Sequence, residues 1–185
     1  MLTAVTGINW GDEGKGRVID LLAENADVVV RYQGGNNAGH TVVAKQQKFV
    51  LNLLPSGILH ENVICVLGDG MVVDLGHLTN EIAQIREKGV VVTSNNLKLS
   101  KRAIISMPWH KIQDELEETR LAKTGAAFGS TKRGIAYAYS DKYRKKTLRL
   151  GDLLHLKEES VQNRLKMMLE AKNLELAGCY HQEPM

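Results

Sequence analysis

Short apolar runs rich in β-branched residues alternate along this chain with longer segments in which apolar and polar positions follow a helical period. The runs have the length of buried strands, and each longer segment has one apolar face, as an amphipathic helix does. This alternation predicts an α/β protein. We expect strands at 2–8, 27–33, 62–70 and 103–107, and helices at 16–25, 75–89, 110–123 and 157–173.

The first strand, a glycine-rich loop, the first helix and the second strand follow one another in the order of a βαβ unit. Such a unit places its strands in parallel with a right-handed crossover. The expected fold class is therefore α/β with a mostly parallel sheet and flanking helices. We also expect a hairpin that turns at residues 45–48. Residues 124–142, rich in Gly, Ser and Thr, are predicted to form a loop too long to be a simple connection.

The composition is that of an ordinary globular domain. The 185 residues are 43% apolar and 24% charged, and a net charge of +3 is too small to favour generic nucleic-acid binding. No apolar run approaches the roughly 20 residues that cross a bilayer. The start at Met1 shows no basic segment of a secretory signal. We expect a cytoplasmic protein with no membrane partner and with a buried, reduced Cys65.

Candidate chemistry begins with the sequence NWGDEGKGR at 9–17. Glycines between a strand and a helix let backbone N–H groups converge on a phosphate at the positive end of the helix dipole, and Lys15 would add a charge. The alternative is a tight turn with a solvated lysine. The motif is not the common P-loop, because Gly16 stands where that motif has a metal-binding Ser or Thr. Asp12 could replace it as an Mg²⁺ ligand or remove a proton, whereas Glu13 is expected to contribute only its backbone N–H.

A second cluster, RYQGGNNAGHT at 31–41, follows the second predicted strand. Its asparagines and Thr41 can form hydrogen bonds, and His40 can donate a proton near neutral pH. Ligands bind at the carboxyl ends of parallel strands, so we expect this cluster and the first loop to open onto one crevice. The remaining histidines show no metal spacing and are expected to be structural or solvated: His60, His77, His110, His155 and His181.

A third cluster, GSTKRG at 129–134, places hydroxyl groups and two cations among glycines. This composition suits an anionic group such as a second phosphate. The basic run KYRKK at 142–146 follows it, and on composition alone this run is either a solvated face or a contact surface. No aromatic platform accompanies the run, so binding of nucleic acid is not favoured.

The three clusters, in this order, closely resemble the signatures of the adenylosuccinate synthetase family, and the stretches LLPSGILHENVICVLGDGMVVD and LRLGDLL are similar to that family as well. The resemblance implies a P-loop-like, GTP-binding architecture. It also implies a GTP- and Mg²⁺-dependent ligation of L-aspartate to IMP through 6-phosphoryl-IMP, a step of AMP biosynthesis.

The resemblance further implies catalytic roles for Asp12, Lys15 and His40. Asp12 would take the N1 proton of IMP and bind Mg²⁺, with the carbonyl oxygen of Gly39 as a second metal ligand. His40 would act as the acid toward the departing GDP. Lys15 and the loop N–H groups would stabilise the transferring phosphoryl group.

The same resemblance implies two sets of binding residues. Those for GTP are Gly11, Asp12, Glu13, Gly14, Lys15, Gly16, Arg17, Gly39, His40 and Thr41. Those for IMP are Asp12, Glu13, Gly14, Lys15, Asn37, Ala38, Gly39, His40, Thr131 and Lys145.

A homodimer is implied as well, because Lys145 stands where the family has a basic residue that reaches the IMP phosphate of the other subunit. Arg144 could take this role by a shift of one position, and KYRKK would then be a dimer contact. Two positions depart from the family pattern: Arg17 replaces the usual lysine, and Tyr137 replaces the usual proline.

Members of this family are much longer than 185 residues. We therefore expect residues 1–185 to be the N-terminal part of a single adenylosuccinate synthetase domain, incomplete at its C-terminus. The segments that contact guanine and aspartate would lie outside it. The alternative is a catalytically inactive remnant that binds a purine nucleotide.

Overall fold

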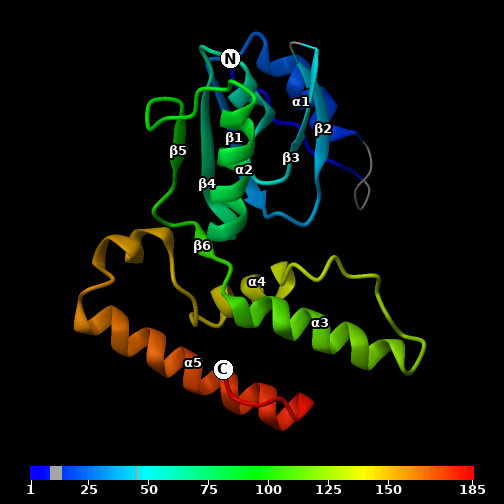
Figure 1. Ribbon diagram of the computed structural model, residues 1–185, viewed down its shortest axis with the longest axis vertical. Helices are drawn as coiled ribbons and strands as arrows, with labels where there is room; N and C mark the ends of the chain where they lie inside the picture. The colour runs from blue at the N-terminus through cyan, green and yellow to red at the C-terminus, as the bar shows by residue number, and fades with distance from the viewer. Residues whose placement is uncertain (9–13, 45) are drawn as a thin grey trace.

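The computed structural model describes residues 1–8, 14–44 and 46–185, and its central feature is a parallel sheet (Figure 1). β1 (Val28–Gly34) pairs with β4 (Ile64–Val73), and β4 pairs with β5 (Leu97–Leu99) and, further along, with β6 (Ile104–Ile105). Each of these pairings is parallel. The predicted α/β class with a parallel sheet is confirmed.

The strand predicted at residues 2–8 is wrong, because the structure has no strand there. Leu2 and Ile8 are fully exposed, and no described strand pairs with this segment. A β-branched run becomes a strand only where a neighbour accepts and donates its backbone hydrogen bonds. The predicted βαβ unit is therefore replaced by another, in which α2 (Leu75–Glu87) connects the parallel strands β4 and β5.

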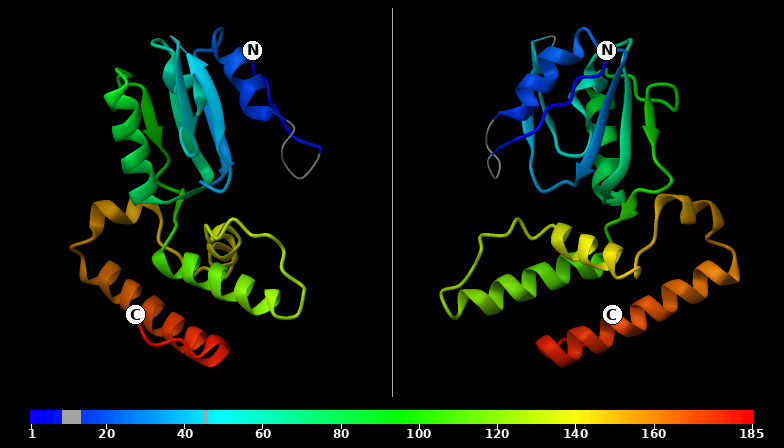
Figure 2. Two further views of the ribbon diagram at one scale, coloured as in Figure 1. Left: turned by 45° about the vertical axis from the view of Figure 1, so that its right-hand side comes forward. Right: turned by 180° about the vertical axis from the view of Figure 1, so that it is seen from behind.

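The helices lie close to their predicted positions, as α1 (Lys15–Ala23), α2, α3 (Pro108–Ala122) and α5 (Glu159–Tyr180). Two short 3₁₀ segments, Ser56–Leu59 and Leu150–His155, were not predicted. Figure 2 shows α2 on one side of the sheet and α1 on the other, with α3 and α5 beyond its carboxyl-terminal edge.

The predicted hairpin is confirmed as β2 (His40–Ala44) paired antiparallel with β3 (Gln47–Leu51). Phe49 and Leu51 of β3 are buried in the main apolar core, together with Cys65 and Leu67 of β4. The predicted burial of Cys65 is thus confirmed, and burial raises the pKa of its thiol to about 12. In the described ranges, no helix is both long enough and apolar enough to cross a membrane.

The loop predicted at 124–142 is wrong in its second half, because residues Ile135–Tyr143 form a helix, α4. Gly134 precedes it with a φ of 71°, a left-handed conformation that favours glycine. Alanines after this point favour a helix, and Ala138 is fully buried. The hydroxyl of Tyr139 donates to the carbonyl of Gly70 (2.7 Å) and accepts from the N–H of Gly34 (2.8 Å). Tertiary contacts therefore fix this helix against the sheet.

A buried cluster of polar side chains joins the three helices α3, α4 and α5, which lie beyond the edge of the sheet. His110 of α3 accepts the N–H of Met107 at Nδ1 (3.0 Å), so its Nε2 donates to Oδ2 of Asp141 on α4 (3.1 Å). Lys172 of α5 lies 3.1 Å from the same oxygen. Burial disfavours the charge on Asp141, but the hydrogen bond from His110 and the charge of Lys172 outweigh burial and lower its pKa.

We predict that Asp141→Asn lowers the free energy of unfolding at pH 7 by about 3 kcal/mol, because it removes the buried carboxylate that His110 and Lys172 share and leaves Lys172 paired with Glu175 alone. A lowered native pKa stabilises the fold above the unfolded value, near 3.9, and that stabilisation is lost as pH falls through the native pKa. The difference between the two proteins should therefore shrink in urea titrations below about pH 4. Asp27→Asn, at an exposed position, is the matched control. A difference that stays constant down to pH 3 would contradict this account.

Candidate functional site

The described part of the first glycine loop forms the start of α1. Gly14 precedes the helix with a φ of 75°, and the first turn carries no acidic side chain. Its N–H groups lie at the positive end of the helix dipole, where an anion is stabilised. Gly11, Asp12 and Glu13 lie outside the described residues, so their roles stay predictions.

The first and second clusters meet where Gly16 contacts His40. A Cβ atom added to Gly16 would lie 2.7 Å from both Cβ and Cγ of His40, a distance that no real Cβ atom tolerates. Gly16 is therefore required by the close approach of α1 to the start of β2. The structure thus brings the two segments together as expected, although no strand precedes the first of them.

His40 is half-buried beside this contact. Its pKa is lowered, first by burial and then by the positive charge of Arg31. Its Nε2 atom has no hydrogen-bond partner among the described residues. The imidazole is therefore a neutral group with an unused nitrogen next to the N-terminus of α1.

Arg31 fixes the backbone that leads to His40. Its guanidinium group donates to the carbonyl oxygens of Asn52 and Gly35, the latter at 2.7 Å, and burial lowers its pKa. Gly39 packs against Asn52, since an added Cβ would lie 2.5 Å from Nδ2 of that side chain. The turn at residue 52 therefore fixes the position of the segment that leads from Arg31 to His40.

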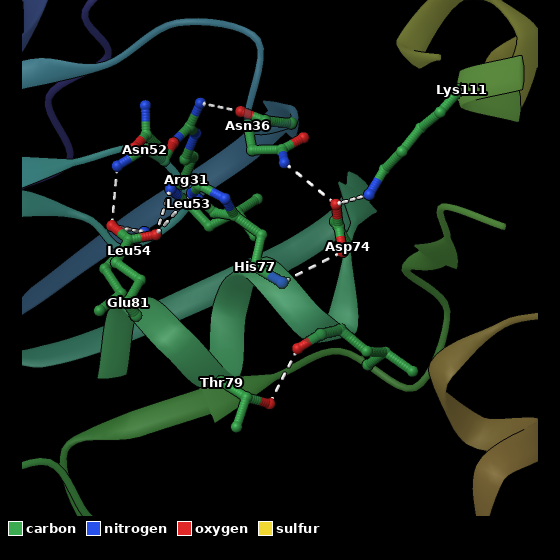
Figure 3. Close-up of polar contacts among 12 residues, drawn as sticks. Arg31, Asn36, Asn52, Leu53, Leu54, Asp74, His77, Thr79, Glu81 and Lys111 are labelled. Carbon is green, nitrogen blue, oxygen red and sulfur yellow. Dashed lines mark hydrogen bonds and ion pairs between the residues drawn. The ribbon is translucent and has the colours of Figure 1, made fainter. Parts of the chain in front are cut away.

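The carboxylate of Glu81 on α2 holds this turn in place (Figure 3). Although Glu81 is buried, it accepts the backbone N–H groups of Asn52 (2.7 Å), Leu53 (2.9 Å) and Leu54 (3.2 Å). Sequence reasoning missed this residue. The available signal was a carboxylate on the apolar face of an amphipathic helix, between Leu78 and Ile85.

Asp74 links the second cluster to two helices (Figure 3). Its carboxylate caps α2 through the N–H of His77 (3.1 Å), accepts from Nδ2 of Asn36 (3.2 Å) and pairs with Nζ of Lys111 on α3 (2.5 Å). Burial disfavours its charge, but the bonds to Lys111 and His77 outweigh burial and lower its pKa. Asn36 is itself buried, and no described residue is hydrogen-bonded to its Oδ1.

The other predicted contact residues of the second and third clusters lie on the surface: Asn37, Ala38, Gly39, Thr41 and Thr131 are exposed. The second cluster also touches α4, because a Cβ added to Gly35 would lie 2.4 Å from Cδ1 of Ile135. The third cluster ends at the N-cap of that helix, Gly134. The second cluster therefore contacts the first through His40 and Gly16, and it contacts the helix that follows the third through Gly35 and Ile135.

The structure separates the two candidates for the dimer contact. Arg144 lies 3.8 Å from a carboxylate oxygen of Asp141 and 3.9 Å from one of Glu175, so it is engaged within the chain. Lys145 is exposed, and no ion pair joins it to another described residue. Of the two side chains, only that of Arg144 pairs with carboxylates within the described part of the chain.

Histidine and carboxylate groups do not form a metal centre in the described part of the chain, where no three of His, Cys, Asp and Glu lie close enough to hold an ion. The predicted structural or solvated character of the other histidines fits their surroundings. His110 is buried on Asp141, and His155 lies 2.7 Å from Glu158 on the surface. The predicted metal ligands are Asp12, outside the described residues, and the carbonyl of Gly39.

A profile of the adenylosuccinate synthetase family matches residues 4–185. The chain belongs to the adenylosuccinate synthetase family. It is 48% identical to the adenylosuccinate synthetase of Halothermothrix orenii over 98% of its own length, and 49% identical to that of Carboxydothermus hydrogenoformans over 94%. It spans only 41% and 39% of those two relatives.

Two solved structures share this fold. A fully ligated adenylosuccinate synthetase from Plasmodium falciparum superposes with a TM-score of 0.78 at 39% identity, covering 95% of this chain and 39% of that one. The succinoaminodeoxyadenylate synthetase of cyanophage S-2L, at 24% identity and a TM-score of 0.59, shares the fold, covering 87% of this chain and 45% of that one.

The contact between Gly16 and His40 predicts a measurable coupling. Gly16→Ala should lower the free energy of unfolding by about 1–3 kcal/mol, because the methyl group overpacks the site. In the double variant with His40→Gly, which removes both the Cβ and the Cγ atom that the methyl group meets, much of that loss should be recovered, which gives a coupling of at least about 1 kcal/mol in a double-mutant cycle.

Gly178→Ala, at an exposed position in the last turn of α5, is the control, and we expect it to be neutral or slightly stabilising. Additive effects of Gly16→Ala and His40→Gly would show that the two segments do not touch.

Proposed function

We propose that this chain carries the phosphoryl-transfer half of an adenylosuccinate synthetase, which joins L-aspartate to IMP at the expense of GTP. The observation that supports this proposal is the packing of His40 against Gly16, at the N-terminus of α1. It places a neutral imidazole with an unused nitrogen beside a helix end suited to phosphate. Family membership supplies the substrate class.

In this mechanism Asp12 takes the N1 proton of IMP, and O6 of the purine attacks the γ-phosphorus of GTP. The bond from that phosphorus to the β–γ bridging oxygen breaks, and GDP leaves. His40 donates a hydrogen bond to the departing oxygen, while Lys15 and the N–H groups of the loop stabilise the charge of the transferring group. The amino group of aspartate then displaces phosphate from C6, which yields adenylosuccinate.

Mg²⁺ fits the donor set that we propose for it. The carboxylate of Asp12 and the carbonyl of Gly39 are oxygen ligands, which this ion prefers, and Gly39 lies on exposed backbone next to His40. When bound, the ion would neutralise part of the charge of the GTP phosphates. Asp12 is thereby proposed both as metal ligand and as base.

Asn37, Ala38 and Thr131 are proposed to hold IMP, and Gly14–Arg17 with Thr41 to hold GTP. Each of the four residues Asn37, Ala38, Thr41 and Thr131 is accessible to a ligand. A homodimer is part of the proposal, with the exposed Lys145 reaching the IMP phosphate of the other subunit. We further propose that residues 1–185 belong to one larger domain and that the protein acts in the cytoplasm.

A hybrid enzyme tests the proposed function. Residues 1–185 would replace the matching segment of the Halothermothrix orenii relative, which is 48% identical to this chain. We expect the hybrid to form adenylosuccinate, followed by its ultraviolet absorbance, from IMP, GTP, aspartate and Mg²⁺. His40→Asn in the hybrid should reduce turnover by at least about 100-fold, the usual contribution of a general acid.

His155→Asn is the matched control, because His155 is exposed and pairs only with Glu158 among the described residues. A folded hybrid that binds both nucleotides but turns nothing over would favour the inactive remnant. Full activity of His40→Asn would contradict the proposed acid.

A further inference from the structure

We propose that Asp114 and Glu118 of α3 are positioning residues, which hold the loop at 128–134 in the conformation that receives the phosphate of IMP. The proposal rests on the proposed function, because Thr131 of that loop is an IMP contact only there. Neither carboxylate belongs to a sequence motif.

Glu118 binds three consecutive backbone N–H groups at the start of the loop. Its two oxygens accept from Phe128 (3.3 Å), Gly129 (2.6 Å) and Ser130 (3.2 Å). Gly129 has a φ of 73°, which lets successive N–H groups turn toward one acceptor. The carboxylate therefore occupies a backbone nest, a structure that binds anions.

Asp114, one helical turn before Glu118, binds both the middle and the end of the loop. One oxygen accepts from the hydroxyl of Ser130 (2.6 Å), and the other accepts from the N–H of Gly134 (2.8 Å). Gly134 is pressed against α3, since an added Cβ would lie 2.5 Å from the carbonyl carbon of His110. The loop is thus attached to α3 at both ends.

The two carboxylates are unusual, because they are buried and no ion pair joins either of them to another described residue. Asp114 is 8% exposed and Glu118 is 9% exposed. Lys132 of the loop lies 3.8 Å from the exposed Glu115 instead. A buried carboxylate must be satisfied by hydrogen bonds, and bonds from N–H groups to a charged acceptor are stronger than neutral ones. The loop therefore has little freedom to leave α3.

Between these anchors the loop presents Thr131, Lys132 and Arg133, all of them exposed. Lys132 is in the left-handed region, with a φ of 54°, and its N–H donates to the hydroxyl of Ser130 (3.1 Å). A hydroxyl and two cations are thus displayed on a backbone that is already ordered. Ordering before binding removes an entropic cost that IMP would otherwise have to offset.

The test uses the hybrid enzyme described above, whose residues 1–185 come from this chain, with Glu118→Ala, Glu118→Gln and, as a control, Glu117→Gln. Glu117 is the adjacent residue, but its carboxylate binds Arg120 and Tyr180 rather than the loop. Two quantities are measured: the rate of trypsin cleavage after Lys132 and Arg133, and the affinities for IMP and GTP by calorimetry.

For Glu118→Ala we expect cleavage about 10-fold faster and IMP binding about 10-fold weaker, as the loss of charge-assisted hydrogen bonds implies, with GTP binding unchanged. Glu118→Gln should be intermediate, because its remaining carbonyl oxygen can still accept from Gly129 and Ser130. The control should match the unsubstituted hybrid.

Unchanged cleavage in Glu118→Ala would overturn the proposal, as would an equal loss of IMP and GTP binding, which a general loss of structure would cause. If the unsubstituted hybrid binds no IMP, the proposed function is contradicted, and the part of this proposal that concerns IMP is contradicted as well. The cleavage rates then still decide whether Glu118 holds the loop.

Discussion

Buried carboxylates on two helices hold the loops on which the site depends. Glu81 of α2 binds the turn at residues 52–54, and Glu118 of α3 binds the start of the loop at 128–134. In each case one side chain accepts three consecutive backbone N–H groups. Backbone groups removed from water must be paired, and a charged acceptor pairs them strongly. The helices thereby determine the conformation of segments that have few apolar side chains of their own.

In this arrangement the helices and strands fix the loop backbones, and the loops carry the polar residues that we propose contact the ligands. Glycines at 16, 35 and 39 permit close approach between segments, and each of them leaves too little room for a side chain. The exposed polar residues between the anchored points are then free to face a ligand. The second cluster is held through Arg31 and Asp74, and the third is held through α3.

Most helices and the inner strands could be predicted from the sequence, because the spacing of apolar residues along these segments follows the face that each element buries. It failed at 2–8, where an apolar run has no described neighbour to pair with, and at α4, where Tyr139 bonds to residues of β1 and β4. The clusters and their roles came from glycine spacing and family resemblance. Glu81 and Glu118 were missed because a single carboxylate on a helix carries no motif, and only the fold shows which backbone it meets.

The most direct measurement is residue-resolved amide hydrogen exchange of the ligand-free chain at neutral pH. The account predicts that the amides of Leu53, Leu54, Gly129 and Ser130 exchange slowly, although none of them lies in a helix or a strand. Ala127 and Thr131, in the same loop but with no hydrogen bond from their N–H groups to a described residue, should exchange rapidly. Equally rapid exchange at all these positions would show that the carboxylates do not hold the loops.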